Sequence, residues 1–403
     1  MLSGNSWLKT KIEAIRKDSP DQTIAVVATQ IRETLGLTNT QIGVLYGPAF
    51  SWVYAFMGLL MGRLADQYSR KYIILIGLMI WSLMTVASGF AASFAFLITA
   101  RLFVGLSQAA LSPAVYSLLA DYFEAHKRAT VFSVYASGIF VGVGLSFLVG
   151  GSVAEAYDWR VALKSVGAPG LILAIIGFMA IKEPDRSLTS QQRASFSQVL
   201  RYIIRKRTVQ FHLLGFSFLA LSGYTILAFI STVLNDVFEA PNLISKYGWF
   251  MLLTGLSVNL SGWMADKLAR KFGPEHRFVM GIFAALAGLP FYYFGFFAGQ
   301  AATAFLLIGV GNVLSSSYNG VAAALIQDFV GSDKRGMAGA VYLFVVSIVG
   351  FGIGPPITGW LIDHYMAANQ ALMLVFTVCG VLASISFIMA MRSYTGDVEI
   401  AER

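Results

Sequence analysis

The chain alternates between long apolar stretches and short polar ones. A helix needs about 20 largely apolar residues to cross a bilayer, and windows of that kind recur from residue 40 almost to the C-terminus. We predict helices at 40–62, 72–91, 93–121, 128–152, 162–182, 209–236, 244–265, 276–298, 300–328, 336–362 and 370–392. With a shorter apolar segment before residue 40, this pattern indicates an all-α membrane protein.

The composition agrees with that class. Only 12% of the 403 residues are charged, whereas soluble domains carry about 25%. The mean hydropathy is +0.68, and the apolar windows leave no room for a large soluble domain. The one cysteine, Cys379, excludes an internal disulfide. The first 20 residues lack the continuous apolar core of a secretory signal peptide.

The net charge of +8 is unevenly distributed along the chain. Most Lys and Arg residues fall in one alternating set of loops, and the opposite set holds only Arg160, Lys164 and Lys246. The positive-inside rule therefore assigns the basic loops, segment 183–208 and the C-terminus to the cytoplasm. The basic excess is topological and does not indicate nucleic-acid binding. We expect a multi-pass protein of the bacterial inner (plasma) membrane.

The polar segment 183–208 divides the chain into halves. Apolar residues at helical spacing lie among basic ones in it, which predicts an amphipathic helix on the inner membrane face. That helix is either a surface tether or a lever that couples the halves. The domains that we expect are a polar N-terminal segment 1–20, helix bundles 21–182 and 209–392, and a tail 393–403.

One loop signature occurs twice, as GRLADQYSRK at Gly62–Lys71 and as GWMADKLARK at Gly262–Lys271. A second echo pairs ADYFEAHKRA at 120–129 with QDFVGSDKRG at 327–336. Glycine lets helices approach closely, and an Asp can pair with a basic residue or a helix N-terminus. The gate residues that we predict are Gly62, Asp66, Arg70, Lys71, Asp121, Arg128, Gly262, Asp266, Arg270, Lys271, Asp328 and Arg335.

With both copies of this signature, the sequence resembles the major facilitator superfamily. The resemblance implies two six-helix bundles related by a pseudo-two-fold axis, a cavity at the midplane, and alternating access by rocking. It also implies that Asp66, Arg70, Asp121 and Arg128 form an inner gate network. The alternative is that these residues only set the topology.

Within the superfamily the sequence is similar to the Spinster-like branch. The similarity lies in QTIAVVATQIRETLGLTNTQIGVLYGPAF (Gln22–Phe50), GRLADQYSRKYI (Gly62–Ile73) and ITARLFVGLSQAALSPA (Ile98–Ala114). It covers nearly the whole chain but is only generic in the second half. The branch implies proton-linked export of amphipathic lipids such as lysophospholipids and sphingosine phosphate, with other substrates open for bacterial members.

Arg101 is the one Lys or Arg deep inside a predicted span. A charge there costs commonly about 2.5–3.5 kcal/mol on insertion scales and marks a functional candidate. It matches the branch's arginine at this position. We expect it to hold an anionic substrate group or a coupling carboxylate; the alternative is a structural bond to backbone carbonyls.

Two positions depart from the branch pattern. The acidic residue expected seven positions after Arg101 is Gln108, and the expected Asp-Arg before Gln22 reads Pro20-Asp21. A carboxylate can bind and release a proton, whereas an amide cannot. We therefore expect weak or absent proton coupling, with Asp21 as the one nearby carboxylate.

Aromatic and amide side chains elsewhere are candidates for lining the cavity, with helix–helix contacts as the alternative. They are Tyr46, Tyr54, Tyr116, Tyr135, Tyr224, Asn259, Asn312, Ser315, Tyr318, Asn319 and Tyr342. Glycines in 128–152, and glycines with Pro355-Pro356 in 336–362, indicate helices that pack closely or act as hinges.

The first helix is short or incomplete in the sequence. Its apolar part is Thr23–Ala28 with Ile31, between Asp21 and the charged pair Arg32-Glu33. Three interpretations stay open: a marginal first span, a truncated or misread start, or a true eleven-span protein.

These observations predict a monomeric secondary active transporter for an amphipathic lipid-like or organic-anion substrate. Alternatives are an uncoupled facilitator, or a truncated or decayed non-transporting protein or sensor. No GxxxxGK[ST] motif supports an ATP-driven pump. The four His residues lie at or near loop ends without clustering, and the sequence contains no metal-ligand or nucleophile motif. We therefore expect neither an enzyme nor a cofactor. The proton gradient is the one candidate energy source.

Overall fold

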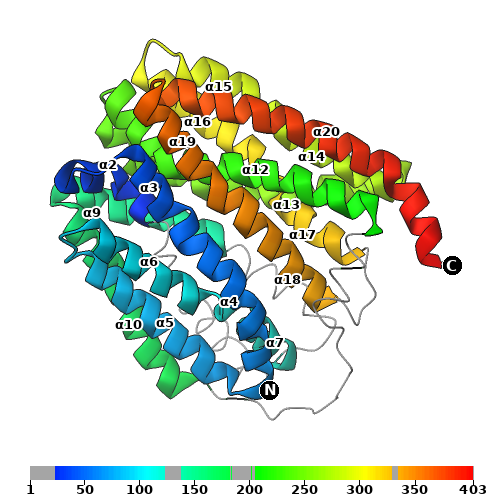
Figure 1. Ribbon diagram of the computed structural model, residues 1–403, viewed down its shortest axis with the longest axis horizontal. Coiled ribbons are helices and arrows are strands. Elements are labelled where there is room, and N and C mark those ends of the chain that lie inside the picture. Colours follow the sequence, from blue (N-terminus) through cyan, green and yellow to red (C-terminus); the bar gives the residue numbers. More distant parts are fainter. Residues whose placement is uncertain are drawn as a thin grey trace, which may run out of the picture. The chain divides into compact units, whose positions relative to one another are not determined.

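The computed structural model describes residues 23–122, 138–181, 183, 201, 205–328 and 335–402. The regular secondary structure of these residues is entirely helical (Figure 1). Eight of the described helices are long and apolar enough to cross a membrane. The chain forms two compact units, 1–188 with 241–252 and 189–240 with 253–403.

The first unit contains the helices that precede residue 181. They are α2 (Thr23–Leu35), α3 (Asn39–Tyr46), α4 (Pro48–Gln67), α5 (Arg70–Ser88), α6 (Phe94–Gln108), α7 (Leu111–Tyr122), the Gly138–Ala156 helix, which ends in α9 (Gly151–Ala156), and α10 (Trp159–Ala180). The short turns Pro241–Leu243 and Ser245–Tyr247 also belong to this unit.

Polar residues begin several of these helices. The Thr38 hydroxyl accepts from the backbone N–H of Gln41, whose side chain accepts in turn from the Thr38 N–H. Ser69, Ser93 and Asp158 accept backbone N–H groups at the starts of α5, α6 and α10. These side chains satisfy N–H groups that have no partner inside the helix.

Close helix packing in the first unit depends on small residues. Gly167 and Gly170 of α10 face α5, where an added Cβ at Gly170 would collide with Ser82. Gly105 of α6 lies against the backbone of Phe50, and its ideal Cβ would be 2.6 Å from the Phe50 oxygen. These contacts bring α10 close to α5, and α6 close to α4, at backbone distance.

The second unit contains the helices after residue 205, apart from the first residues of α13. They are α12 (Arg207–Thr232), α13 (Gly248–Phe272), α14 (Phe278–Ala287), α15 (Leu289–Phe296), α16 (Ala301–Ser315), α17 (Asn319–Asp328), α18 (Arg335–Val345), α19 (Gly352–His364) and α20 (Ala368–Glu402). Helix α20 runs along α12 in Figure 1, and the two pack extensively. A buried apolar cluster from α12, α14, α17, α18 and α20 forms the core of this unit.

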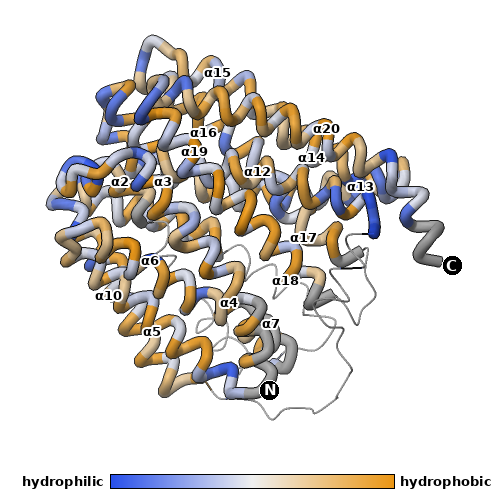
Figure 2. The backbone as a smooth tube through the Cα atoms, viewed as in Figure 1, coloured by the Kyte–Doolittle hydropathy of each residue, from blue (hydrophilic) through white to orange (hydrophobic). Residues whose placement is uncertain are grey.

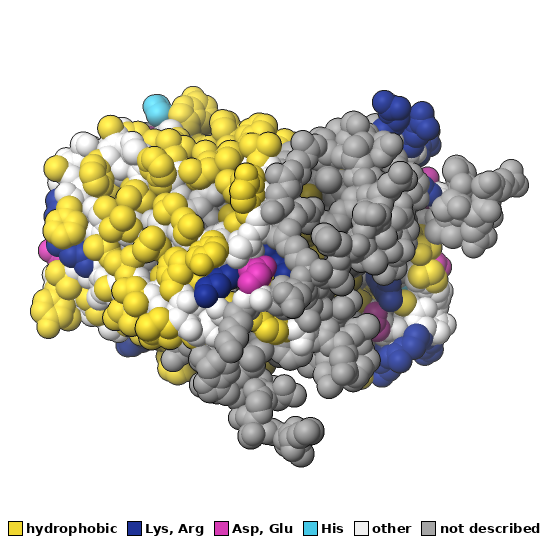
Figure 3. Space-filling model, turned by 90° about the horizontal axis from the view of Figure 1, so that it is seen from below, with side chains coloured by type: hydrophobic (Ala, Val, Ile, Leu, Met, Phe, Trp, Pro, Cys, Tyr) yellow, Lys and Arg dark blue, Asp and Glu magenta, His cyan; other side chains and the backbone are white. Residues whose placement is uncertain are grey.

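The outer faces of both units are apolar. Hydrophobic residues dominate the membrane-length helices (Figure 2), and apolar side chains cover much of the described surface (Figure 3). Met179 is 77% exposed and Leu256 is 68% exposed. Large side chains of this type are stable on the outside of a protein that faces lipid.

The predicted spans from residue 40 onward are confirmed as helices wherever the structure describes them, but four of them are interrupted. The interruptions lie at Gly47, at Ala109–Ala110, at Gly288 and at Ser316–Tyr318. Hydropathy cannot detect a local turn inside an apolar stretch. The last helix also continues to Glu402, beyond the expected end at 392, and the tail contains no proline that would end it.

Three segments contain π-helical turns. Ser146–Gly150 lies in the Gly138–Ala156 helix, Val233–Val237 follows α12, and Val346–Phe351 joins α18 to α19. The first and third begin 200 residues apart (346 − 146), which is also the offset between the signature copies at Gly62 and Gly262. Both lie in the glycine-containing helices for which the sequence suggested close packing or a hinge.

Several predictions fall outside the described residues. These are the segment 1–20 with Pro20 and Asp21, Arg128, Tyr135 and most of the predicted amphipathic helix. Helix α2 is described from Thr23 to Leu35, so the length of the first helix stays a prediction.

Candidate functional site

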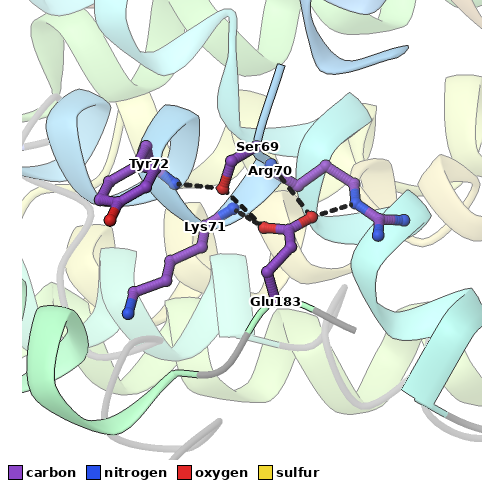
Figure 4. Close-up of polar contacts among 5 residues, drawn as sticks. All are labelled: Ser69, Arg70, Lys71, Tyr72 and Glu183. Atoms are coloured by element: carbon purple, nitrogen blue, oxygen red, sulfur yellow. Dashed lines mark hydrogen bonds and ion pairs between the residues drawn. The ribbon is translucent and has the colours of Figure 1, made fainter. Parts of the chain in front are cut away.

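The first signature copy is held by a carboxylate from beyond the end of α10. Arg70, the first residue of α5, is buried, and its Nε donates to Glu183 Oε1 at 2.8 Å (Figure 4). The backbone N–H groups of Arg70 and Lys71 donate to the same carboxylate at 3.3 and 2.8 Å. The Ser69 hydroxyl donates to Oε2 at 2.8 Å. Glu183 therefore both caps α5 and pairs with its arginine.

These contacts set the charge of Glu183. Partial burial raises the pKa of its carboxyl, but the hydrogen bonds from the Lys71 backbone, the Arg70 side chain, Ser69 and the Arg70 backbone together lower it below the ordinary value of 4.5. The carboxylate is charged at neutral pH. Lys71 adds a bond from its Nζ to the Phe178 oxygen at 2.8 Å, near the end of α10.

The sequence analysis identified Arg70 and Lys71 but missed Glu183. A signal was present, because Glu183 is the first acidic residue after the apolar stretch that becomes α10. Helix positions are described for Gly62, Asp66, Asp121 and Asp328, but their side chains, and that of Arg335, are not among the described ones. The predicted pairing of these residues stays a prediction.

The second signature copy has a different environment. Asp266 Oδ1 lies 3.0 Å from Arg277 Nη2, in the turn Pro274–Arg277, and the Asp266 side chain is 61% exposed. Arg270 Nε donates to the backbone oxygen of Asp266 at 3.3 Å. The Lys271 ammonium lies 4.9 Å from the centre of the Phe272 ring. Among the described residues, no atom lies within 4 Å of an added Cβ at Gly262, so this glycine makes no close approach to them.

Arg101 lies at the interruption between α3 and α4. It is 3% exposed, its Nε donates to the Leu45 oxygen at 3.2 Å, and its guanidinium carbon lies 5.1 Å from the centre of the Phe50 ring. Gly47 separates the end of α3 from Pro48, the first residue of α4, and the α-helical bonding is broken there. A guanidinium at the end of α3 interacts favourably with the helix dipole and with backbone oxygens that helix interruption frees. The bond to a carbonyl that we gave as the alternative for Arg101 is thus present.

The two coupling positions are only partly described. Gln108 is the last residue of α6 and is half-buried, one residue before the interruption at Ala109–Ala110. Its amide does not ionise at ordinary pH. Asp21 lies outside the described residues.

The predicted cavity residues divide into buried and accessible ones. Tyr46, Asn312, Tyr318 and Tyr342 are all buried, and Tyr318 and Tyr342 belong to the core of the second unit. Their position favours helix–helix contacts, which were the stated alternative, over contact with a solute in this conformation.

The accessible candidates also contact protein groups. Tyr54 stacks on Phe50 at 5.5 Å, and Tyr224 stacks on Phe351 at 3.8 Å between ring centres. Exposed Asn259 and Asn319 donate to the backbone oxygens of Gly255 and Ser316. Ser315 is half-buried, and the side chain of Tyr116 is not among those described. Lining of a cavity by these residues stays a prediction.

Among the described residues, no group of three or more His, Cys, Asp or Glu side chains is arranged to hold a metal ion. The features that the structure brings together are a half-buried carboxylate that caps α5 and pairs with buried Arg70, and a buried guanidinium at a helix interruption. Both are typical of membrane proteins that handle charge within or beside the bilayer.

Comparisons with known proteins identify the family. The family model "Major Facilitator Superfamily" matches residues 21–352. The "Hexuronate transporter" of Bacillus subtilis is 25% identical over 93% of this chain and 91% of its own length. "Protein spinster homolog 1" of Xenopus laevis is 25% identical over 88% of this chain and 72% of its own length.

Solved structures agree on the fold. A bacterial homolog of the human lysosomal transporter Spinster, in an inward-facing and unoccupied conformation, matches with a TM-score of 0.85 and 24% identity, over 98% of this chain and 99% of the other. The nucleoside transporter NupG (D323A mutant) matches with a TM-score of 0.75 and 15% identity, over 96% and 99%. The chain therefore belongs to the Major Facilitator Superfamily and is a multi-pass integral membrane protein that is similar to the Spinster homologs.

Proposed function

We propose that the chain is a secondary transporter for an amphipathic or organic anionic solute, and that Arg101 attracts the anionic group. The observation that carries the proposal is a 3% exposed guanidinium held at a helix interruption by the Leu45 oxygen. Leaving water is costly for a cation in a membrane span, and an anion that approaches it would offset part of that cost. Alternating access is the mechanism that the superfamily fold supports.

Two of the relatives support an organic anionic substrate, one through the name of a small anion and the other through the resemblance to lipid transporters. Hexuronate, named for the Bacillus subtilis relative, is a small organic anion. The Spinster homologs are the source of the lipid expectation made from the sequence. Both classes share a negatively charged group, and they differ in the apolar tail that a transport assay can vary.

The proposal includes weak proton coupling. Gln108 occupies the position where the branch pattern has a carboxylate, and it cannot bind and release a proton in the way that a carboxylate does. An uncoupled facilitator is therefore the second candidate. We also propose a monomer in the bacterial inner membrane with the basic loops in the cytoplasm, from the distribution of Lys and Arg.

The test uses the full chain in liposomes with three radiolabelled probes: lysophosphatidylcholine, sphingosine 1-phosphate and glucuronate. Uptake is measured at equal pH and with an imposed pH gradient. We expect saturable uptake of at least one probe, without uphill accumulation when the gradient is applied. No uptake above that of empty liposomes would refute the transport proposal, and gradient-driven accumulation would refute weak coupling.

Variants at Arg101 test its role. We expect Arg101→Gln to raise the KM of an anionic probe about tenfold, which corresponds to about 1.4 kcal/mol, and Arg101→Lys to recover part of that loss. Arg160→Gln is the matched control, because Arg160 donates to the Ala91 oxygen between α5 and α6 and not to the interruption between α3 and α4. An unchanged KM in Arg101→Gln would remove Arg101 from the substrate site.

A further inference from the structure

A buried histidine in α12 has no part in the proposed transport site. His212 is fully buried, although the sequence places it near a loop end. It belongs to the second unit, whose helices α12, α17 and α18 are labelled in Figure 1. A buried imidazole needs hydrogen-bond partners for both ring nitrogens. The partners of His212 therefore show which segments its side chain connects.

Both nitrogens face the segment that contains the interruption of the α16–α17 helix. His212 Nε2 lies 3.0 Å from the Ala322 oxygen, and Nδ1 lies 3.4 Å from the Tyr318 hydroxyl. A carbonyl oxygen can only accept, so Nε2 carries the hydrogen. Nδ1 is then an acceptor, and the Tyr318 hydroxyl donates to it. In this arrangement the neutral imidazole satisfies both partners.

Aromatic rings surround this pair. The centres of the Phe278, Tyr342 and Phe387 rings lie 5.7, 6.4 and 6.3 Å from the centre of the His212 ring. Phe387 also packs edge-on against Tyr318 at 4.8 Å. The imidazole is thereby held among side chains of α12, α14, α18 and α20 and the α16–α17 turn.

Two glycines make room for the central ring of the cluster. An added Cβ would come within 2.9 Å of the Phe387 ring at Gly215 and within 2.8 Å at Gly281. Glycine on both sides is thus needed for Phe387 to reach Tyr318. The cluster therefore depends on compatible residues from several helices.

The interruption that His212 contacts is a tight turn in a polar sequence. Ser316 N–H donates to the Asn312 oxygen at 3.0 Å, and Asn319 N–H donates to the Ser316 oxygen at 3.3 Å. Asn312 is buried just before the turn, and Asn319 is exposed just after it. The position of α17 relative to α16 therefore determines where the side-chain amides of Asn312 and Asn319 lie relative to each other.

The corresponding interruption in the first unit has a different anchor. Helix α7, which follows Ala109–Ala110, packs through a buried apolar cluster of Ile74, Ala114 and Leu118. Apolar contacts are non-directional, whereas the two bonds of His212 fix both the turn and the first part of α17. The described contacts at these two corresponding turns therefore differ, with apolar packing of α7 in the first unit and two hydrogen bonds from His212 in the second.

We propose that His212 is a positioning residue for transport: its bonds to Ala322 and Tyr318 fasten α17 to α12 and fix the turn between Asn312 and Asn319. The positioning role rests on the proposed transport function, whereas the fastening of α17 does not. An experiment that measures both keeps the two separable.

The fastening is tested by hydrogen exchange of the purified full chain, read by mass spectrometry. We expect His212→Phe to speed exchange about tenfold in peptides covering 316–328, because it removes both bonds and retains an aromatic ring. Tyr318→Phe removes one bond and should give a smaller increase. His212→Gln can donate to the Ala322 oxygen and should restore much of the protection. Peptides from α7 should not change.

Transport of the probe with the highest wild-type uptake among lysophosphatidylcholine, sphingosine 1-phosphate and glucuronate tests the positioning role. We expect His212→Phe to raise the KM at least threefold at an equal amount of folded protein, with recovery in His212→Gln. His364→Phe is the matched control, because His364 is exposed at the end of α19.

Two results would overturn the proposal. Unchanged exchange in 316–328 in His212→Phe would show that His212 does not fasten α17. Faster exchange with unchanged KM and maximal rate would show that the position of α17 is not used in transport. If the wild-type chain carries none of the probes, the transport proposal fails, and the exchange result still decides the fastening.

Discussion

The carboxylate of Glu183 offers a sharp test of how the first signature copy is held. In Glu183→Gln, one of two carboxylate oxygens becomes an NH₂ group that faces hydrogen-bond donors. The four bonds from Ser69, Arg70 and Lys71 can then no longer all be made. Removing one partner of a fully buried ion pair costs about 3–5 kcal/mol. Because the Glu183 side chain is 26% exposed, water compensates in part, and we expect about 2 kcal/mol.

The assay is thermal unfolding of the purified protein in detergent at pH 7. For a unit of 150–250 residues, about 1 kcal/mol corresponds to a change in Tm of roughly 2–4 °C, so Glu183→Gln should unfold roughly 4–8 °C below the wild type. Glu155→Gln is the matched control, since Glu155 is an exposed residue of α9. An unchanged Tm in Glu183→Gln would refute the assigned role.

The pH dependence gives the second half of the same test. The folded-state pKa of Glu183 is lowered, so its charged form stabilises the fold at pH values above the ordinary 4.5. That contribution is lost as the pH falls from 4.5 through the lowered pKa. The Tm difference between the wild type and Glu183→Gln should therefore shrink below pH 4.5. A difference that stays constant in that range would contradict the ionic explanation.

Three further predictions concern other parts of the chain. Arg277→Ala should lower the Tm by at most about 2–4 °C, because its pair with exposed Asp266 is worth about 1 kcal/mol or less; a larger loss in the same melting assay would be inconsistent with that exposure. Gly354→Val should destabilise the fold by about 1–3 kcal/mol, since an added Cβ at Gly354 lies 2.8 Å from Thr225 Oγ1. Size-exclusion profiles and Tm values check this loss of stability, with Gly339→Val as the control at an open position. Gln108→Glu should make uptake depend on pH between about 5 and 8, and a flat pH profile would argue against this position as a coupling site.

The spans were predictable from the sequence because burial in lipid needs long apolar stretches of known length. Their interruptions were visible only as weak local signals. Pro48 after Gly47 lacks the N–H that a continuous helix needs, and Ser316–Tyr318 precedes Asn-Gly, which favours turns. Hydropathy averages over these residues, so they were absorbed into single predicted helices.

The partners of the functional residues could not be derived from spacing. Arg70 meets Glu183 across 113 positions of sequence, and Arg101 meets the Leu45 oxygen across 56. Such contacts depend on which helices pack together, and the backbone oxygen of Leu45 has no signature in the sequence at all. His212 was expected near a loop end for the same reason, because nothing local shows that aromatic side chains of α14, α18, α20 and the α16–α17 turn surround it.

The position of Glu183 changes how the signature is understood. Both Arg70 and Glu183 lie in the first compact unit, so a rigid movement of the units does not need to break their bond. A bond that survives the movement cannot act as a gate, but it can keep α5 and the end of α10 together while the unit moves. The second copy has no pair with a buried arginine among its described side chains, since Asp266 is 61% exposed and Arg277 is 27% exposed. The two copies are thus alike in sequence and different in what they hold, and the difference arises from one glutamate that follows α10.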